Sequence, residues 1–281
     1  MAELKIATWV DWGKSFVDED GNFYCGTTIQ EKQNARKISE GADIYLYLGD
    51  FHTRSSSEFT VNGGLYPAHN LIARDNDYNS QLGVPECKTT SPQLTDILLD
   101  MVKDKRSGLI VPRHVFFQDY DGQDVKDIKP AFNFQDVEKT YGVKRLNPVE
   151  FLDGGIEYIV NAKHMFNGAG LQSTEWIGHV ENIPQLEMNI FTLLKQKYGQ
   201  GKGLQFDIDG VVMGICIYQT ASGIKQIFPK AEVNIIADAS THLLIKELGF
   251  SEIGTADAAI RSMCKQVGLN YTTTAEYLGM K

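Results

Sequence analysis

The segment from residue 49 to residue 70, GDFHTRSSSEFTVNGGLYPAHN, concentrates side chains that bind metal ions. It holds two of the six histidines of the chain and two acids, namely Asp50, His52, Glu58 and His69. Imidazole and carboxylate together suit a borderline divalent cation such as Zn, Fe, Mn or Co, and an Asp-x-His pair on extended backbone directs both side chains to one side. A single loop histidine is more often a hydrogen-bonded structural residue, but the grouping favours a metal site.

Two further segments place an ionisable residue directly after an apolar run. Asp11 follows the run at 4–10 in VDWGKSF, and Lys163 follows the run at 156–162 in AKHMFNG. Each residue taken alone has an ordinary explanation: Asp11 as a helix N-cap or turn acid, and Lys163 as a solvated lysine. Either residue needs partners to take part in catalysis.

Cys216 lies in GVVMGICIYQTASGI, where an apolar run changes into a segment with helical spacing. A thiol at a helix N-terminus is favoured as the thiolate by the unpaired backbone amides and the helix dipole. Taken alone, however, a cysteine in such an apolar run is more often a small buried hydrophobe than a reactive thiol. Four strand ends that carry Asp, a metal-binding group, Lys and Cys favour one shared crevice.

The elements that position these residues are apolar runs of strand length, which alternate with segments of helical spacing. The runs cover 4–10, 42–48, 108–117, 156–162, 210–217 and 233–237, and the helical segments cover 27–40, 91–105, 173–198, 216–228 and 256–267. Because the runs are continuously apolar, they predict strands covered on both faces. We therefore expect a three-layer, doubly wound α/β fold, with a mostly parallel sheet of about six strands and helices on both faces. Sites in such sheets form at the carboxyl ends of the strands.

The composition indicates an ordinary globular chain, with 281 residues of which 42% are hydrophobic and 22% charged. This length fits a single domain, 1–281. The stretch at about 74–150 is more polar and less regular, and we interpret it as an insertion that serves as a lid or an oligomer contact. We expect a homo-oligomer.

Charge and patterning argue against several classes of partner. A net charge of -9 without a basic block disfavours binding to nucleic acid or to an acidic membrane. The N-terminus lacks the basic region and cleavage site of a signal peptide, and no apolar stretch reaches the ~18 residues of a membrane span. The four cysteines show no CxxC spacing, which disfavours a zinc knuckle or dithiol motif. We predict a cytoplasmic protein with a small-molecule substrate.

In their order along the chain, these segments resemble the nicotinamidase/pyrazinamidase branch of the isochorismatase-like cysteine hydrolases. VDWGKSF resembles the VDxQxDF opening of the family, and GDFH and YPAHN resemble its DxH and WPxHC metal-site segments. NAKHMFNGA resembles its strand-end lysine segment, CIYQTA its nucleophile segment CVxxTA, and ADAS its DA segment after the next strand. ADAAIRSMCKQVGLNYTT resembles its final helix and strand.

The resemblance implies a role for each matching residue. It implies a catalytic triad of Asp11, Lys163 and Cys216, a metal held by Asp50, His52 and His69 with Glu58 as a further ligand, and aromatic packing of Phe16 and Tyr66 on the substrate ring. It also implies a cis bond at Val211–Val212 and an oxyanion hole formed by the amides of Val212 and Cys216. The cofactor would be one divalent ion: zinc in the first place, with manganese or iron as alternatives.

The activity that the resemblance implies is hydrolysis of nicotinamide, and of pyrazinamide, through a thioester on Cys216, a step of NAD salvage. The chain departs from the family in two places: MGI replaces the usual TD before the nucleophile segment, so Ile215 cannot make a polar contact there, and Asn70 stands where many members have cysteine. Two alternatives remain open, an amidase of the same fold for another small amide or ureido compound and a non-catalytic binding protein. A metal-dependent phosphoesterase is disfavoured because no second metal motif is present.

Overall fold

The structure, a computed structural model, describes residues 2–50, 52, 54, 56–71, 89–102, 159–163, 190–242 and 253–280. The strands in these ranges are β1 (Leu4–Val10), β2 (Ile44–Asp50), β3 (Ile159–Lys163), β4 (Leu204–Val211), β5 (Glu232–Thr241) and β6 (Asn270–Thr272). The α-helices are α1 (Lys14–Val17), α2 (Ile29–Ser39), α4 (Asp96–Val102), α7 (Ile190–Tyr198), α8 (Tyr218–Ile227), α9 (Ile253–Val267) and α10 (Thr274–Tyr277). A 3-10 turn spans Thr60–Asn62, and a π-helical turn spans Met213–Ile217.

The six strands form one sheet in the order β3-β2-β1-β4-β5-β6, and all the pairings between them are parallel. The chain winds outward from β1 to β3 on one side and from β4 to β6 on the other, so the strand order reverses between β1 and β4. This topology confirms the predicted doubly wound α/β fold with about six strands. Ligands of such sheets bind at the carboxyl ends of the strands, at the point where the order reverses.

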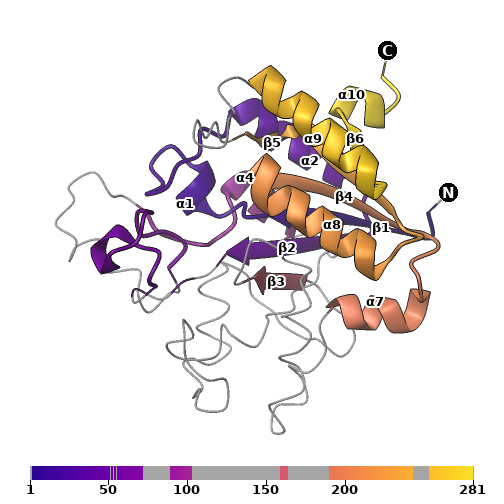
Figure 1. Cartoon of the computed structure of the whole chain (residues 1–281), viewed down its shortest axis with the longest axis horizontal. Helices are drawn as coiled ribbons and strands as arrows, with labels where there is room; N and C mark the ends of the chain where they lie inside the picture. The colour runs from indigo at the N-terminus through magenta and orange to yellow at the C-terminus, as the bar shows by residue number, and fades with distance from the viewer. Residues whose placement is uncertain are drawn as a thin grey trace, which may run out of the picture.

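Helices cover both faces of the sheet (Figure 1). Ile6 and Val10 of β1 face a core that includes side chains from α7, α8 and α9, whereas Ala7 and Trp9 face a second core that includes side chains from α1, α2 and α4. Neighbours along the strand alternate between the two cores because successive side chains point to opposite faces. The three-layer arrangement predicted from continuous apolar runs is therefore confirmed.

Helix α2 begins at a capping box formed by Thr28 and Glu31. Thr28 caps the helix: its hydroxyl accepts a hydrogen bond from the amide of Glu31, and the Glu31 carboxylate accepts one from the Thr28 amide at 2.6 Å. Such a capping box satisfies two amides that have no partner inside the helix. Ala35 and Ile38 are buried on the inner side of the helix, so the predicted helix at 27–40 is confirmed with slightly narrower bounds.

Strand β4 differs from the prediction, which placed a strand at 210–217. The strand instead begins at Leu204 and ends at Val211, and the later residues of the run enter the π-helical turn. Its sequence LQFDIDGV contains two acids, so it is not a continuous apolar run, yet every residue in it is buried. Asp207 is accommodated because it accepts hydrogen bonds from Asn234 Nδ2 at 2.7 Å and Tyr277 OH at 2.6 Å. Buried polar groups are tolerated when they are paired in this way.

The remaining predicted elements agree to within a few residues or lie outside the described part. The predicted strand at 108–117 and the first half of the predicted helix at 173–198 lie outside the described residues. Residues 89–102 fall within the predicted insertion, but Leu94 and Leu98 are buried in the core. The rest of the predicted insertion lies outside the described residues, so the single-domain organisation stays a prediction.

None of the helices in the described part of the chain combines the length and apolar character that crossing a membrane requires.

Candidate active site and metal centre

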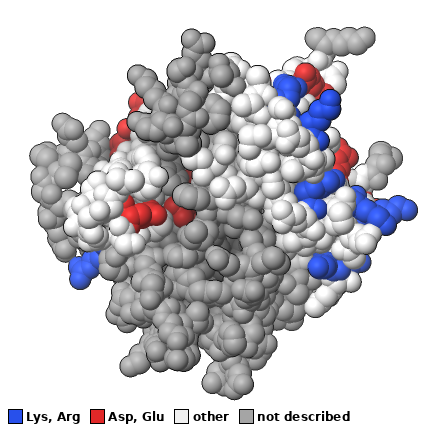
Figure 2. Space-filling model, viewed as in Figure 1, with Lys and Arg blue, Asp and Glu red and all other residues white. Residues whose placement is uncertain are grey.

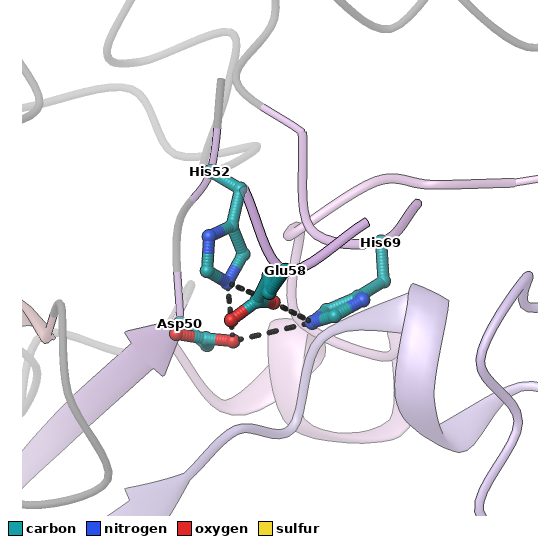
Figure 3. A group of neighbouring side chains, drawn as sticks. All are labelled: Asp50, His52, Glu58 and His69. Carbon is teal, nitrogen blue, oxygen red and sulfur yellow. Dashed lines mark hydrogen bonds and ion pairs between the residues drawn. The ribbon is translucent and has the colours of Figure 1, made fainter. Parts of the chain in front are cut away.

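The end of β2 and the turn after it bring four potential metal ligands together (Figure 3). Asp50 is the last residue of β2, and one ligand atom from each of Asp50, His52, Glu58 and His69 lies within 4.8 Å of the others. His52 Nε2 lies 2.8 Å from Asp50 Oδ2 and 3.2 Å from Glu58 Oε1. His69 Nε2 lies 3.5 Å from Asp50 Oδ2 and 3.2 Å from Glu58 Oε1. All four residues predicted as ligands therefore point toward one centre.

The second ring nitrogen of each histidine has a contact of its own. His69 Nδ1 donates a hydrogen bond to the Pro67 carbonyl at 2.6 Å, and His52 Nδ1 lies 3.3 Å from the Ser56 hydroxyl. A carbonyl partner at Nδ1 fixes the tautomer and leaves Nε2 as the nitrogen that can bind a metal. Two imidazoles and two carboxylates are a donor set for a borderline divalent ion, so these residues fit the metal implied by the resemblance.

The charges in this cluster shift each other's proton affinity. Burial alone would lower the pKa of His69, but the carboxylates of Asp50 and Glu58 outweigh it and raise that pKa to about 9. Burial alone would raise the pKa of Glu58, whereas its hydrogen bond with His69 and the charge of His52 lower it overall. A cation bound at Glu58 and at Nε2 of His69 would therefore compete with protons for the same site.

The backbone after β2 is folded so that the ligands converge. The amide of His52 donates to the carbonyl of Asn70 at 3.0 Å, which places the two histidine segments side by side. The amide of Tyr66 donates to the carbonyl of Glu58 at 2.9 Å and closes the turn between them. Gly64 is required in that turn because a Cβ there would lie 2.1 Å from the carbonyl of Glu58.

Aromatic rings pack against the two histidines among the four potential metal ligands. The rings of Phe16 and Phe23 lie 5.0 and 4.9 Å from the ring of His69, and Phe23 lies 5.6 Å from Tyr66. Phe59 packs against both histidines from 5.3 to 5.4 Å. Phe16 and Tyr66, the two predicted substrate-binding residues, are therefore linked through Phe23 into one aromatic wall beside His69.

Two of the potential metal ligands and one ring of the aromatic wall reach the surface. The side chain of Glu58 is 33% exposed and that of Asp50 is 14% exposed. Tyr66 is 40% exposed. Acidic side chains appear in Figure 2 over the side of the molecule that holds the segment after β2, whereas Lys and Arg lie mainly over α7, α8 and α9. The four potential metal ligands are therefore only partly buried as a group, with Glu58 the most exposed of them.

Asp11 follows β1 directly and is buried. Its φ of 57° lies in the left-handed region, and its amide donates to the carbonyl of Leu48 in β2 at 2.9 Å. Non-glycine residues in this region are uncommon and cluster at functional sites. Burial raises the pKa of Cys25 to about 12, and the charge of Asp11 adds to that rise. Asp11 is therefore a buried acid in a constrained backbone conformation at the end of β1.

Cys216 lies in the π-helical turn between β4 and α8 and is 9% exposed. The sequence prediction that it sits where a strand changes into a helix is confirmed. The bond between Val211 and Val212 is cis, as the resemblance implies. Gly210 precedes it with a φ of 138°, and a Cβ there would lie 1.9 Å from the carbonyl oxygen of Val10, so this backbone passes against β1 at a distance that only glycine allows.

Lys163 is the last residue of β3, and its backbone pairs with Asp50 of β2. The sheet register also aligns Val10 with Leu48 and with Gly210. The strand ends that carry the three predicted triad residues therefore lie along one edge of the sheet. Their joint action as a triad, and the oxyanion hole at the amides of Val212 and Cys216, stay predictions.

Two residues of this region were not predicted from the sequence. Phe23 lies in a loop without periodic pattern, so nothing marked it as the ring between Phe16 and Tyr66. Asp209 is completely buried and accepts a hydrogen bond from the indole of Trp12 at 2.6 Å. An acid next to the apolar run at 210–217 was the available signal for Asp209.

Comparison with known proteins gives a likeness in structure rather than in sequence. No protein-family model matches the chain, and no curated protein matches it. Among solved structures, PnC1 from L. infantum in complex with nicotinate is 10% identical and aligns over 97% of this chain and 93% of that one, with a TM-score of 0.53. The yeast nicotinamidase is 12% identical over 96% and 99% of the two chains, with a TM-score of 0.53.

A nicotinamidase and pyrazinamidase of Acinetobacter baumanii is 10% identical over 98% of each chain, with a TM-score of 0.52. At such identities the likeness concerns the fold, which extends over nearly the whole of both chains. The expected resemblance to nicotinamidases is confirmed at this level: this chain has the α/β fold of the nicotinamidase structures.

Proposed function

We propose that this chain is a metal-containing cysteine amidohydrolase of the nicotinamidase type, which converts nicotinamide, and pyrazinamide, to the carboxylic acid and ammonia. The observation that carries the proposal is the cluster of Asp50, His52, Glu58 and His69 at the end of β2. The fold shared with nicotinamidases and the position of Cys216 at the end of a central strand support it. A non-catalytic binding protein, which is the alternative, would not require both the four-residue cluster and a cysteine at the end of a central strand.

The proposed reaction is acyl transfer to the thiol of Cys216. Asp11 accepts the proton of the thiol, Lys163 stabilises the charges that result, and the sulfur attacks the carboxamide carbon. The amides of Val212 and Cys216 hold the tetrahedral oxyanion, a type of contact whose loss costs ~2.7 to 4 kcal/mol in other hydrolases. Asp11 returns the proton to the leaving ammonia, and water then hydrolyses the thioester to the acid.

The proposed metal ligands serve orientation in this scheme. Asp50, His52, Glu58 and His69 would hold one divalent ion, with zinc as the first choice and manganese or iron as alternatives. When bound, the ion supplies a Lewis acid for the ring nitrogen of the substrate. Phe16, Phe23 and Tyr66 would bind the ring of the substrate by packing against it.

On this proposal the chain contributes to NAD salvage. We also propose that it forms a single domain, because its described strands form one sheet, and that it is a cytoplasmic homo-oligomer.

Ammonia release from nicotinamide by the purified protein tests the proposal. We expect Cys216→Ala to lower kcat by at least about 1000-fold. Cys264→Ala is the matched control, because Cys264 is also a cysteine with a buried side chain but lies in α9 rather than in the turn after β4. Full activity of Cys216→Ala would exclude the thioester.

The proposal predicts that a chelator abolishes turnover and that added zinc, manganese or iron restores it. If the wild type, loaded with each metal in turn, released no ammonia from nicotinamide but did so from another small amide, the alternative amidase of the same fold would be correct.

A further inference from the structure

Trp12 and Asp209 form a buried hydrogen bond between two neighbouring strand ends. The indole Nε1 of Trp12 donates to Asp209 Oδ1 at 2.6 Å, and both residues are 0% exposed. Trp12 is the second residue after β1, and Asp209 lies near the end of β4, the strand that pairs with β1. The hydrogen bond therefore joins the two strands where the sheet order reverses.

Each partner of this hydrogen bond is next to a part of the proposed reaction site. Trp12 directly follows Asp11, whose φ of 57° must be maintained by its surroundings. Asp209 directly precedes Gly210, which packs against Val10 and leads into the turn that carries Cys216. The amide of Asp11 is held by Leu48, and the carbonyl of Trp12 accepts from the amide of Thr95 at 3.0 Å. The hydrogen bond from the Trp12 indole is a third constraint on the position of this segment, and it is the one that connects the segment to β4.

The chemistry of Asp209 suits an uncharged hydrogen-bonding role. Burial, and then the negative charge of Asp207, raise the pKa of Asp209 well above its usual range, and the bond from Trp12 offsets part of the rise. Its second oxygen, Oδ2, has no hydrogen-bond partner among the described residues. A neutral acid can occupy such a site at a lower cost than a carboxylate, because burying an unpaired charge is far more unfavourable.

We propose that Asp209 is a positioning residue, which through Trp12 fixes Asp11 relative to the turn that carries Cys216. This inference rests on the proposed function, in which Asp11 accepts the proton of the Cys216 thiol. In this role Asp209 acts separately from the four potential metal ligands and from the aromatic wall. The expected consequence is on the rate of the chemical step, because neither residue belongs to the surfaces proposed to bind the ring.

The same sheet face contains a matched control. Trp9 of β1 is also 0% exposed, and its indole Nε1 donates to the Ser39 hydroxyl of α2 at 2.8 Å. Trp9→Phe and Trp12→Phe thus each remove one buried indole hydrogen bond from neighbouring positions. The bond of Trp9 leads to a helix on the face of the sheet, whereas that of Trp12 leads to β4 beside the proposed site.

The experiment compares Trp12→Phe, Trp9→Phe, Asp209→Asn and Asp209→Val with the wild type, each shown to be folded by circular dichroism. The first measurement is kcat and KM for ammonia release from nicotinamide by the metal-loaded protein. We expect Trp12→Phe and Asp209→Val to lower kcat by about 10-fold to 100-fold, since a displacement of about 1 Å can have such an effect, with little change in KM. Asp209→Asn keeps an oxygen acceptor for the indole and should retain most of kcat, and Trp9→Phe should retain it as well.

The second measurement is the rate at which iodoacetamide alkylates Cys216, followed by peptide mass spectrometry, which requires no substrate. We expect slower alkylation in Trp12→Phe and Asp209→Val than in Trp9→Phe and Asp209→Asn. Equal effects of Trp9→Phe and Trp12→Phe in the two measurements would overturn the proposal, as would a full loss in Asp209→Asn. If the wild type released no ammonia, the proposed function would fail, and the alkylation rates would still decide whether the bond positions Asp11.

Discussion

Oε1 of Glu58 lies 3.2 Å from Nε2 of His69 and at the same distance from Nε2 of His52. Because one carboxylate oxygen faces both imidazole nitrogens, we expect Glu58 to bind the proposed ion directly rather than to support another ligand. We expect Glu58→Ala to weaken zinc binding by at least about tenfold. Calorimetric titration with Zn²⁺ measures this, with the exposed Glu19→Ala as the control. An unchanged affinity would show that Glu58 is not a ligand.

Phe23→Leu should weaken substrate binding without affecting the chemical step. The Phe23 ring touches Phe16, His69 and Tyr66, and aromatic pairs contribute about 0.5 to 1.5 kcal/mol each beyond their buried area. We therefore expect KM for nicotinamide to rise about 2-fold to 10-fold with kcat nearly constant. Phe191→Leu is the control, since Phe191 packs on Phe228 in the other core. A fall in kcat alone would argue against a wall that binds the ring.

Asp209 should make stability decrease as pH rises. The pKa of Asp209 is raised in the folded chain above the value of about 3.9 for an unperturbed aspartate, so between these two values the folded chain keeps a proton that the unfolded chain has released. The free energy of unfolding then falls by about 1.4 kcal/mol per pH unit in this window. Asp209→Asn lacks this titration, and its stability relative to the wild type should increase as pH rises.

Urea unfolding at several pH values between 5 and 8 measures this difference. The exposed Asp20→Asn serves as the control, and its stability relative to the wild type should not follow the same trend. A constant difference between Asp209→Asn and the wild type would mean that Asp209 is ionised in the folded protein.

Gly210→Ala should strongly destabilise the protein for two reasons. The new Cβ would lie 1.9 Å from the carbonyl oxygen of Val10, and the alanine would have to adopt a φ of 138°. We expect a loss of at least about 3 kcal/mol in the free energy of unfolding. Gly41→Ala meets no atom within 4 Å and has an ordinary φ, so it should be neutral or stabilising. Chemical denaturation compares the two, and similar results would show that β1 and β4 separate easily at this point.

The sequence predicted the fold class and the grouping of the four potential metal ligands because both depend on local order. Continuous apolar runs mark strands buried on two faces, and the cluster occupies a single turn after β2. Motif spacing was sufficient to bring Asp50, His52 and Glu58 into one place, since the backbone between them is short. His69 joins them through the pairing of its segment with His52.

Features that depend on long-range packing could not be predicted in the same way. The polar residues of β4 kept its first part out of the strand predicted at 210–217, because the groups that satisfy Asp207 come from Asn234 on β5 and Tyr277 on α10. The link from Trp12 to Asp209 spans most of the chain in sequence and has no motif. Contacts of this kind depend on tertiary structure and leave little trace in local periodicity.

The indole of Trp12 and the carboxyl group of Asp209 also constrain how this sequence can change over evolutionary time. If either is replaced by an apolar residue, the other becomes a buried polar group without its partner, at a cost of about 1 to 3 kcal/mol, whereas replacing both with apolar residues of similar shape can be nearly neutral. Relatives of this chain should therefore have both residues or neither. The pair can serve as a lineage marker for proteins that organise the junction of β1 and β4 in this way.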